Sequence, residues 1–225
     1  MKLLTEADVL NAVKNGAKTL AVAADTIITP SARDAAVLHK VQFSTDVSSP
    51  APSVGVQSVA MHEPMDKRSP NASTIVALGA DHGGYQMKEQ LKAFLLGAGY
   101  SVADVGTNSE QACDYPDFAY AVASLVSSGR ASKGIMIDGV GVASAIVANK
   151  VPGIRAVPCS NEFAARSSRE HNDANVLTLG GRVLGIEAAK SIVKVWLETW
   201  FGGGRHQVRV EKITDIERRF SSRND

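Results

Sequence analysis

From residue 74 onward, short runs of apolar and β-branched residues alternate with longer stretches in which apolar residues recur every three or four positions. The short runs predict strands, and the longer stretches predict amphipathic helices. The predicted strands cover residues 74–79, 100–105, 134–137, 154–158 and 176–179, and the predicted helices cover 85–98, 116–128, 142–150, 161–170, 186–201 and 208–220. Regular alternation with short connections favours a parallel sheet with helices on both faces. We therefore predict an α/β fold for residues 74–225, with a three-layer α/β/α arrangement around a sheet of about five parallel strands.

The chain before this domain divides into a small module, residues 1–47, and a linker, residues 48–73. In the module, Thr5 and Asp8 have the spacing of a capping box for a helix that Gly16 ends. Residues 20–28 predict a strand, 31–38 a second helix and 41–43 another strand. The segment 29–34 could be an anion-binding helix start, although a plain N-terminal cap is the favoured interpretation.

The module contains no catalytic constellation. We predict that it is a docking or targeting element, for instance for a protein shell or a partner enzyme, and that deleting residues 1–70 leaves catalysis intact. The linker is rich in Ser, Pro and Asn, and its prolines at positions 50, 52, 64 and 70 exclude a regular helix or a central strand. Little fixed structure is expected there.

Composition narrows the classes of function. The net charge of +1 gives no support for binding nucleic acid or an anionic membrane surface. No apolar run approaches the length that spans a bilayer, and the N-terminus lacks the pattern of a secretory signal. Cys113 and Cys159 are the only cysteines, with neither a disulfide framework nor metal-ligand spacing. We predict a cytoplasmic setting, with a bacterial protein compartment as an alternative, and neither metal nor cofactor.

Polar residues follow the first and third predicted strands of the domain. Asp81 and His82 come after strand 74–79 and precede Gly83 and Gly84. The carboxyl edge of an open α/β sheet is where ligands bind, and the two glycines would let the backbone approach an anion. A tight βα turn with solvated polar residues is the alternative, and this stretch alone does not separate the two.

Asp138 heads a glycine-rich loop after strand 134–137. It could abstract a proton, while the N–H groups of Gly139–Gly141 could stabilise an oxyanion. A carboxylate that caps the following helix is an equally weighted alternative. His171 suits a proton shuttle at neutral pH, but taken alone it fits better as a helix C-terminal histidine favoured by the helix dipole.

Arg205 and Arg209 are four residues apart, so on a helix both would face one side and could hold one phosphate, with Arg182 as a third donor. Surface salt bridges are the alternative for each arginine taken singly. Three arginines with His82 would make a cationic pocket of the size of a phosphate.

These motifs occur together in one order, which resembles the ribose-5-phosphate isomerase B / galactose-6-phosphate isomerase family over about residues 74–220. The resemblance rests on Asp81–Gly84, Asp114–Pro116, Gly139-x-Gly141 with Ala148–Lys150, Gly153–Ala156, Arg169–Asp173, Gly181–Arg182 and Gly203–Arg209. It implies a Rossmann-like α/β/α fold and an aldose–ketose isomerase without a metal, working as a homodimer or homotetramer with active sites at the subunit interface. The default reaction is ribose 5-phosphate to ribulose 5-phosphate through an enediolate, and a six-carbon or deoxy sugar phosphate is an alternative.

The resemblance also implies roles for single residues. Asp81 and Tyr115 would contact the sugar. His82, Arg182, Arg205 and Arg209 would hold the phosphate. His171 would open the furanose ring, and Asn172 with Gly139 and Gly141 would stabilise the enediolate.

The chain departs from the family at the expected base. Family members carry Cys where this chain has Asp138, or Glu where it has Ser144, and a hydroxyl residue where it has Val140. We predict that Asp138 is the base, with a pKa raised by partial burial. The alternative is a catalytically weak partner subunit or sugar-phosphate binding protein, like the A subunit of galactose-6-phosphate isomerase. A nucleotide-binding regulatory domain would fit the fold but leaves the arginines unexplained.

Overall fold

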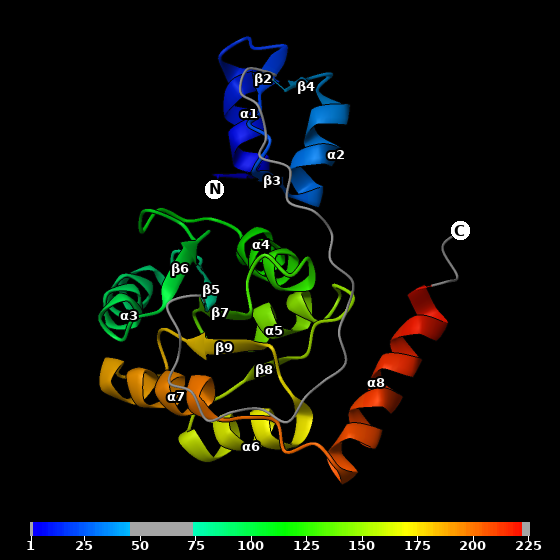
Figure 1. Ribbon diagram of the computed structural model, residues 1–225. Coiled ribbons are helices and arrows are strands. Elements are labelled where there is room, and N and C mark those ends of the chain that lie inside the picture. The colour runs from blue at the N-terminus through cyan, green and yellow to red at the C-terminus, as the bar shows by residue number, and fades with distance from the viewer. Residues whose placement is uncertain (1, 46–73, 222–225) are drawn as a thin grey trace.

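The computed structural model describes residues 2–45 and 74–221 (Figure 1). The predicted linker, residues 48–73, lies outside the described residues. The main domain is built on a five-stranded parallel sheet in the order β6-β5-β7-β9-β8. Its strands are β5 (Ile75–Ala80), β6 (Ser101–Asp104), β7 (Lys133–Asp138), β8 (Ala156–Pro158) and β9 (Val176–Gly180). All five lie within one or two residues of the predicted strands at each end.

Helices cover both faces of this sheet, so the predicted three-layer fold is confirmed. The helices are α3 (Tyr85–Gly97), α4 (Tyr115–Ser127), α5 (Val142–Ala148), α6 (Glu162–Asn172), α7 (Ile186–Glu198) and α8 (Arg205–Ser221). Alternate residues of β5 enter different apolar clusters: Val76 and Leu78 pack with α3, α6 and α7, whereas Ala77 packs with α4 and α5. This is the period of two that a strand imposes on its side chains.

Two helix ends differ from prediction in a way that matters for the site. Helix α6 runs two residues further and includes His171 and Asn172, because Asp173 ends it in the left-handed conformation at φ 47° and is held by Arg169, with Nη1 2.7 Å from Oδ1. Helix α8 begins three residues earlier, at Arg205, directly after Gly203 and Gly204 with positive φ. Arg205 and Arg209 are therefore both helical and share a face.

The N-terminal module has more strands than predicted. It consists of β1 (Lys2–Leu4), α1 (Glu6–Lys14), β2 (Thr19–Ala21), β3 (Thr26–Ile28), α2 (Pro30–Leu38) and β4 (Gln42–Ser44). The single strand predicted for residues 20–28 is wrong: a turn closed by the Thr26 N–H and the Ala23 carbonyl divides it. Its halves pair with different partners, β2 with β4 and β3 with β1.

Both helices of the module begin at side-chain caps. The Thr5 backbone N–H donates to Asp8 Oδ2 at 2.8 Å, and the predicted capping box is present. Thr29 Oγ1 accepts from the Ala32 N–H at 3.2 Å, so the start of α2 is the plain cap that the sequence favoured.

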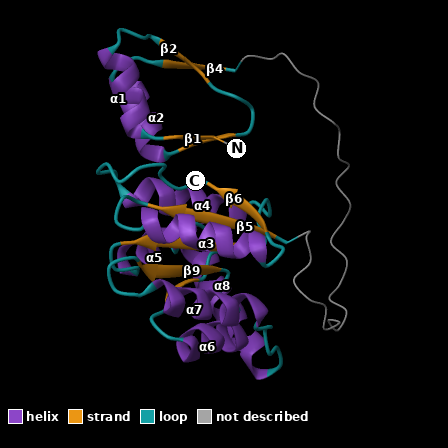
Figure 2. Ribbon diagram, turned by 90° about the vertical axis from the view of Figure 1, so that its left-hand side faces the viewer, coloured by secondary structure: helices purple, strands orange, loops and turns teal. Residues whose placement is uncertain are grey.

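The module is seated on α4 of the main domain in both views (Figures 1 and 2). The Ser31 hydroxyl donates to Asp117 Oδ1 on α4 at 2.5 Å. Ile27 is a member of the apolar cluster that contains Phe118 of α4, and Leu3 packs against that cluster. The contact is therefore both polar and apolar.

Among the described helices, none combines the length and the apolar character that crossing a bilayer requires.

Lys133, the first residue of β7, gives a test of the energetics of this fold. Its pKa is lowered from 10.5 to about 8, by burial first and then by the charge of Arg169. Between pH 8 and pH 10.5 the unfolded chain binds a proton at this lysine that the folded chain does not, so the free energy of unfolding rises with pH in this range. Below pH 8 the lysine is charged in both states and destabilises the fold. Lys133→Met should raise the free energy of unfolding at pH 7 by roughly 1–3 kcal/mol, since a tenfold change in a proton-binding constant is worth about 1.4 kcal/mol.

Urea unfolding at pH 7 and at pH 10.5 would measure this effect, with Lys212→Met on the exposed face of α8 as the matched control. The variant should also lose the rise in stability between pH 8 and pH 10.5 that we expect for the wild-type chain. A lower free energy of unfolding at pH 7 would mean that Lys133 contributes favourable interactions that outweigh its burial.

Candidate active site

The site is organised at the carboxyl ends of β5 and β7. These strands are neighbours in the sheet. After β5 the chain continues to β6 on one side, and after β7 it continues to β8 on the other. Such a reversal opens a crevice at the strand ends. The Asp81 N–H donates to the Ile137 carbonyl at 3.2 Å, which brings Asp81 and Asp138 to the same edge.

Asp81 is held by the turn that follows it. Its Oδ1 accepts the N–H groups of Gly83 at 2.8 Å and Gly84 at 3.1 Å. Burial raises its pKa; the Asp138 charge acts in the same direction, and the two N–H donors with the His82 charge oppose them. The expectation that these glycines receive an external anion is not supported, because both N–H groups bind Asp81. Gly84 instead permits close packing, since a Cβ there would overlap the Ile137 carbonyl oxygen.

Asp138 is only 4% exposed, and its carboxylate caps α5. Oδ1 accepts from the N–H groups of Val140 at 2.7 Å and Gly141 at 2.5 Å, and Oδ2 accepts from the Ser144 N–H at 2.9 Å. Burial acts to raise the pKa of Asp138, but the hydrogen bonds from Ser144, Gly141 and Val140 lower it by more. The predicted rise of this pKa is therefore wrong, and the Gly141 N–H of the predicted oxyanion loop already has a carboxylate partner.

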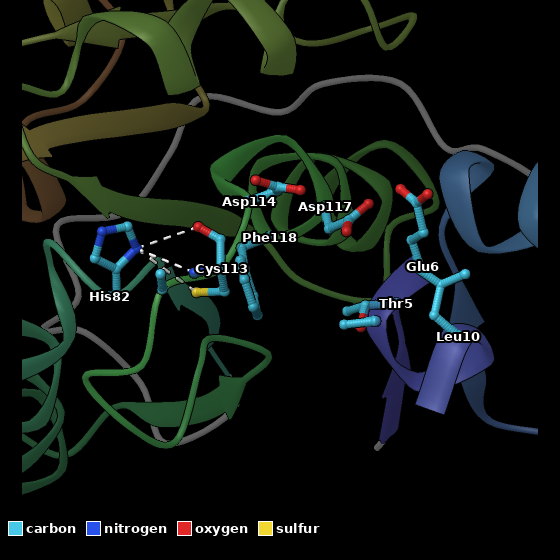
Figure 3. Close-up of a pocket in the computed structure, with 10 residues that line it drawn as sticks. Thr5, Glu6, Leu10, His82, Cys113, Asp114, Asp117 and Phe118 are labelled. Atoms are coloured by element: carbon cyan, nitrogen blue, oxygen red, sulfur yellow. Dashed lines mark hydrogen bonds between the residues drawn. The ribbon is translucent and has the colours of Figure 1, made fainter. Parts of the chain in front are cut away.

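His82 stands between two hollows of the surface. Its Nδ1 lies 3.3 Å from the Cys113 backbone nitrogen and 3.2 Å from the Cys113 carbonyl oxygen, which fix the ring against the loop before α4. On one side, His82 and Arg182 line a cavity of about 340 Å³ together with Gln86. The other hollow adjoins the N-terminal module (Figure 3). Of the predicted phosphate ligands, the structure brings His82 and Arg182 together.

A second group of predicted site residues lies at the C-terminal end of α6 and the start of α8. The rings of His171 and His206 stack at a centroid distance of 4.4 Å, and Arg205 Nε is 3.5 Å from His206 Nε2. Ser167 Oγ lies 3.1 Å from His171 Nδ1 and orients that ring. The pKa of His206 is lowered, by burial first and then by the charge of His171.

These two groups occupy opposite ends of the sheet in one chain. The segment after α6 lies at the amino ends of the strands, because the Asn175 carbonyl accepts the Gly134 N–H at 2.9 Å where β7 begins. The other group follows the carboxyl ends, one strand length or ~16 Å away. A single chain therefore does not gather His171, Arg205 and Arg209 around the ligand that His82 and Arg182 can reach.

The remaining predicted residues have defined places. Tyr115 is the first residue of α4 and packs against its apolar cluster. Asn172 is exposed, and its carbonyl accepts from Arg155 Nε at 3.1 Å. Gly139 adjoins the Arg182 side chain. Gly141 has φ 86°, and a Cβ there would lie 2.8 Å from the Leu179 carbonyl carbon.

Sequence reasoning gave no role to His206, Ser167 or Cys113, all of which touch a predicted site residue. The spacing of four between Ser167 and His171 on a helix was the available signal for one of them. His206 and Cys113 approach their partners only through folding. In the part of the chain that the structure describes, no three His, Cys, Asp or Glu side chains are grouped so that they could hold a metal ion.

Comparison with known proteins gives a consistent match to the main domain. A family model described as Ribose/Galactose Isomerase matches residues 76–213. Ribose-5-phosphate isomerase B of Escherichia coli (strain K12) is 50% identical over 144 residues, which cover 64% of this chain and 97% of the relative. Galactose-6-phosphate isomerase subunit LacA of Streptococcus equi subsp. zooepidemicus is 41% identical, covering 63% of this chain and 98% of the relative. The solved structure of Clostridium thermocellum ribose-5-phosphate isomerase B is 50% identical with a TM-score of 0.65, covering 65% of this chain and 99% of that one.

Proposed function

The chain belongs to the ribose/galactose isomerase family and is a sugar-phosphate isomerase, and we propose that its substrate is ribose 5-phosphate, which it converts to ribulose 5-phosphate through an enediolate. The observation that carries this proposal is the placing of two buried carboxylates, Asp81 and Asp138, on neighbouring strand ends close to a cavity lined by His82 and Arg182. An aldose–ketose isomerase needs a base, a donor for the carbonyl oxygen and an anchor for the phosphate.

The two carboxylates divide the acid and base roles by their environments. Isomerisation removes the proton from C2 of the open-chain aldose and delivers a proton to C1, while the O2 hydroxyl loses its proton and O1 gains one, so that the carbonyl moves from C1 to C2. The lowered pKa of Asp138 keeps it ionised and able to accept a proton. Burial shifts the pKa of Asp81 in the opposite direction, and we assign this residue to contact with a sugar oxygen. Such a divergence of neighbouring pKa values is a general sign of assigned acid and base.

The phosphate anchor and ring opening would come from two copies of the chain. His82 and Arg182 of one copy would meet His171, Asn172, Arg205 and Arg209 of another, since one copy holds these groups at opposite ends of its sheet. Helix α8 offers a surface for this association: Ile213, Ile216 and Phe220 are 46–61% exposed along one face. A homodimer or homotetramer is therefore part of the proposal.

A catalytically weak partner subunit is the second candidate. Two observations favour it. Both oxygens of the Asp138 carboxylate accept hydrogen bonds from backbone N–H groups at the start of α5, and the chain is 41% identical to a galactose-6-phosphate isomerase A subunit. In this case the chain would bind a sugar phosphate and require another chain for turnover.

The purified full chain should interconvert ribose 5-phosphate and ribulose 5-phosphate without added metal, and galactose 6-phosphate more slowly. Unphosphorylated ribose is the control, because it lacks the group that His82 and Arg182 would hold. A colorimetric ketose assay in the presence of a chelator would measure both rates. Binding of ribose 5-phosphate without turnover would favour the second candidate, and equal rates for ribose and its phosphate would remove the role of the anchor.

We still predict that the N-terminal module docks to a protein shell or a partner enzyme, and that the chain works in the cytoplasm. Val37 and Leu38 of α2, which are 81% and 75% exposed, would be available to such a partner.

A further inference from the structure

The N-terminal module packs against the main domain in this structure. The Ser31 hydroxyl binds the buried Asp117 carboxylate, and Ile27 is only 9% exposed within the cluster of α4. A buried apolar contact and a hydrogen bond to a buried charge fix the orientation of the module as well as its position. Its first helix, α1, is thereby aimed at the loop that precedes α4.

Helix α1 and this loop enclose a cavity of about 400 Å³. Thr5, Glu6 and Leu10 line one side, and His82, Cys113 and Asp114 line the other (Figure 3). His82 also lines the cavity that contains Arg182. The two cavities therefore meet at one side chain, and a ligand held by His82 has the module as a neighbour.

The two cavities differ in charge. The cavity on one side of His82 is lined by Arg182 and by Glu110, whose carboxylate accepts a hydrogen bond from Gln86. The cavity under the module is lined by Glu6, Asp114 and Asp117 and by no Arg or Lys among the described residues. An anionic group is favoured beside Arg182 and disfavoured beside these carboxylates. A substrate with one phosphate fits this polarity, and a substrate with a phosphate at each end does not.

We propose that the N-terminal module is a wall of the substrate site, and that Glu6 makes this wall select sugars that carry a single phosphate. The proposal rests on the proposed function for the identity of the ligand. It adds a specificity element that the matched relatives lack over their length, since the match to the E. coli enzyme covers 97% of that protein but only 64% of this chain. It also replaces the expectation that the first 70 residues can be deleted without effect on catalysis.

Cys113 provides a readout that does not depend on turnover. It lines the cavity under the module, and the other cysteine of the chain, Cys159, is 5% exposed with a pKa raised to about 11. The rate at which iodoacetamide alkylates Cys113 in the full chain therefore measures how well the module covers this cavity. Mass spectrometry locates the modified cysteine. Cys113 should react slowly in the wild-type chain and at least ~10-fold faster in Ser31→Asp, where two carboxylates would face each other and detach the module.

The same reaction measures ligand selection. Ribulose 5-phosphate should protect Cys113 in the wild-type chain at a lower concentration than ribulose 1,5-bisphosphate does. Glu6→Gln should reduce the ratio of these two concentrations by roughly three- to tenfold, because it removes one charge from the wall without changing its shape. Asp34→Asn is the matched control, since it removes one charge from an exposed position on α2, outside this lining, and should leave the ratio unchanged.

Each outcome decides between the alternatives. Equal alkylation rates in wild type and Ser31→Asp would overturn the docking of the module. Faster alkylation in Ser31→Asp without protection by either sugar phosphate would overturn its role as a wall of the site, even in an active isomerase. If protection of Cys113 changes in Glu6→Gln as expected but the chain shows no turnover, the result would support the module as a wall of the site. It would count against the proposed catalysis instead.

Discussion

Asp138→Asn should lower kcat for isomerisation by about 10²- to 10⁴-fold, the range that a positioned general base contributes. The amide nitrogen cannot accept the proton from C2. It would also face the Ser144 N–H, which now donates to Asp138 Oδ2 at 2.9 Å, so a loss of about 1–3 kcal/mol of stability is expected as well. Initial rates with ribose 5-phosphate, measured together with urea unfolding, would separate the two effects.

Asp138→Cys distinguishes a base from a structural cap. Because the pKa of Asp138 is lowered, its base form is present across pH 5–8 and this group imposes no loss of activity in that range. A thiol at the same position titrates near pH 8.5, so the activity of the variant should rise with pH through that region. A purely structural Asp138 would leave the pH profile unmoved.

Asp81→Asn is the matched control for charge at this edge. An asparagine oxygen can still accept from the N–H groups of Gly83 and Gly84, so the turn should be kept. We expect a smaller effect on kcat than for Asp138→Asn. Loss of turnover in Asp81→Asn with activity retained in Asp138→Asn would assign the base to Asp81 and contradict our proposal.

Mixing two inactive variants should restore about a quarter of the wild-type activity. One carries Asp138→Asn, and the other carries Arg205→Ala with Arg209→Ala, both exposed residues of α8. If each site takes its base from one copy and its arginines from another, a mixed dimer has one intact site and one doubly altered site. Random mixing makes half of the dimers mixed, and half of their sites are intact.

Co-refolding of the two variants followed by the isomerase assay would measure this recovery. The control is a mixture of Asp138→Asn with His82→Ala, because both changes fall in the same half of the site and no mixed dimer regains an intact one. Equal recovery in the two mixtures, or none in either, would contradict a site shared between copies.

The layers of the main domain and the starts of the two helices of the N-terminal module could be predicted from the sequence alone. Strand β5 alternates between two apolar clusters because its own residues alternate, and Thr5 and Thr29 cap their helices through atoms three residues away. These interactions are local, so spacing along the chain is enough to predict them. The order of motifs was likewise enough to indicate the family that the comparison then gave for residues 76–213.

The direction of the Asp138 pKa shift and the separation of the site residues between the two ends of the sheet could not be predicted, because both depend on tertiary packing. Whether burial or hydrogen bonding sets a pKa depends on how many donors reach the carboxylate, and here three backbone N–H groups do. The distance between His82 and His171 depends on which end of the sheet each occupies, which follows from the direction of α6 relative to the strands. The position of the N-terminal module on the main domain could not be predicted either, because Ser31 and Asp117 are 86 residues apart in the sequence and only the packing of the two units brings them together.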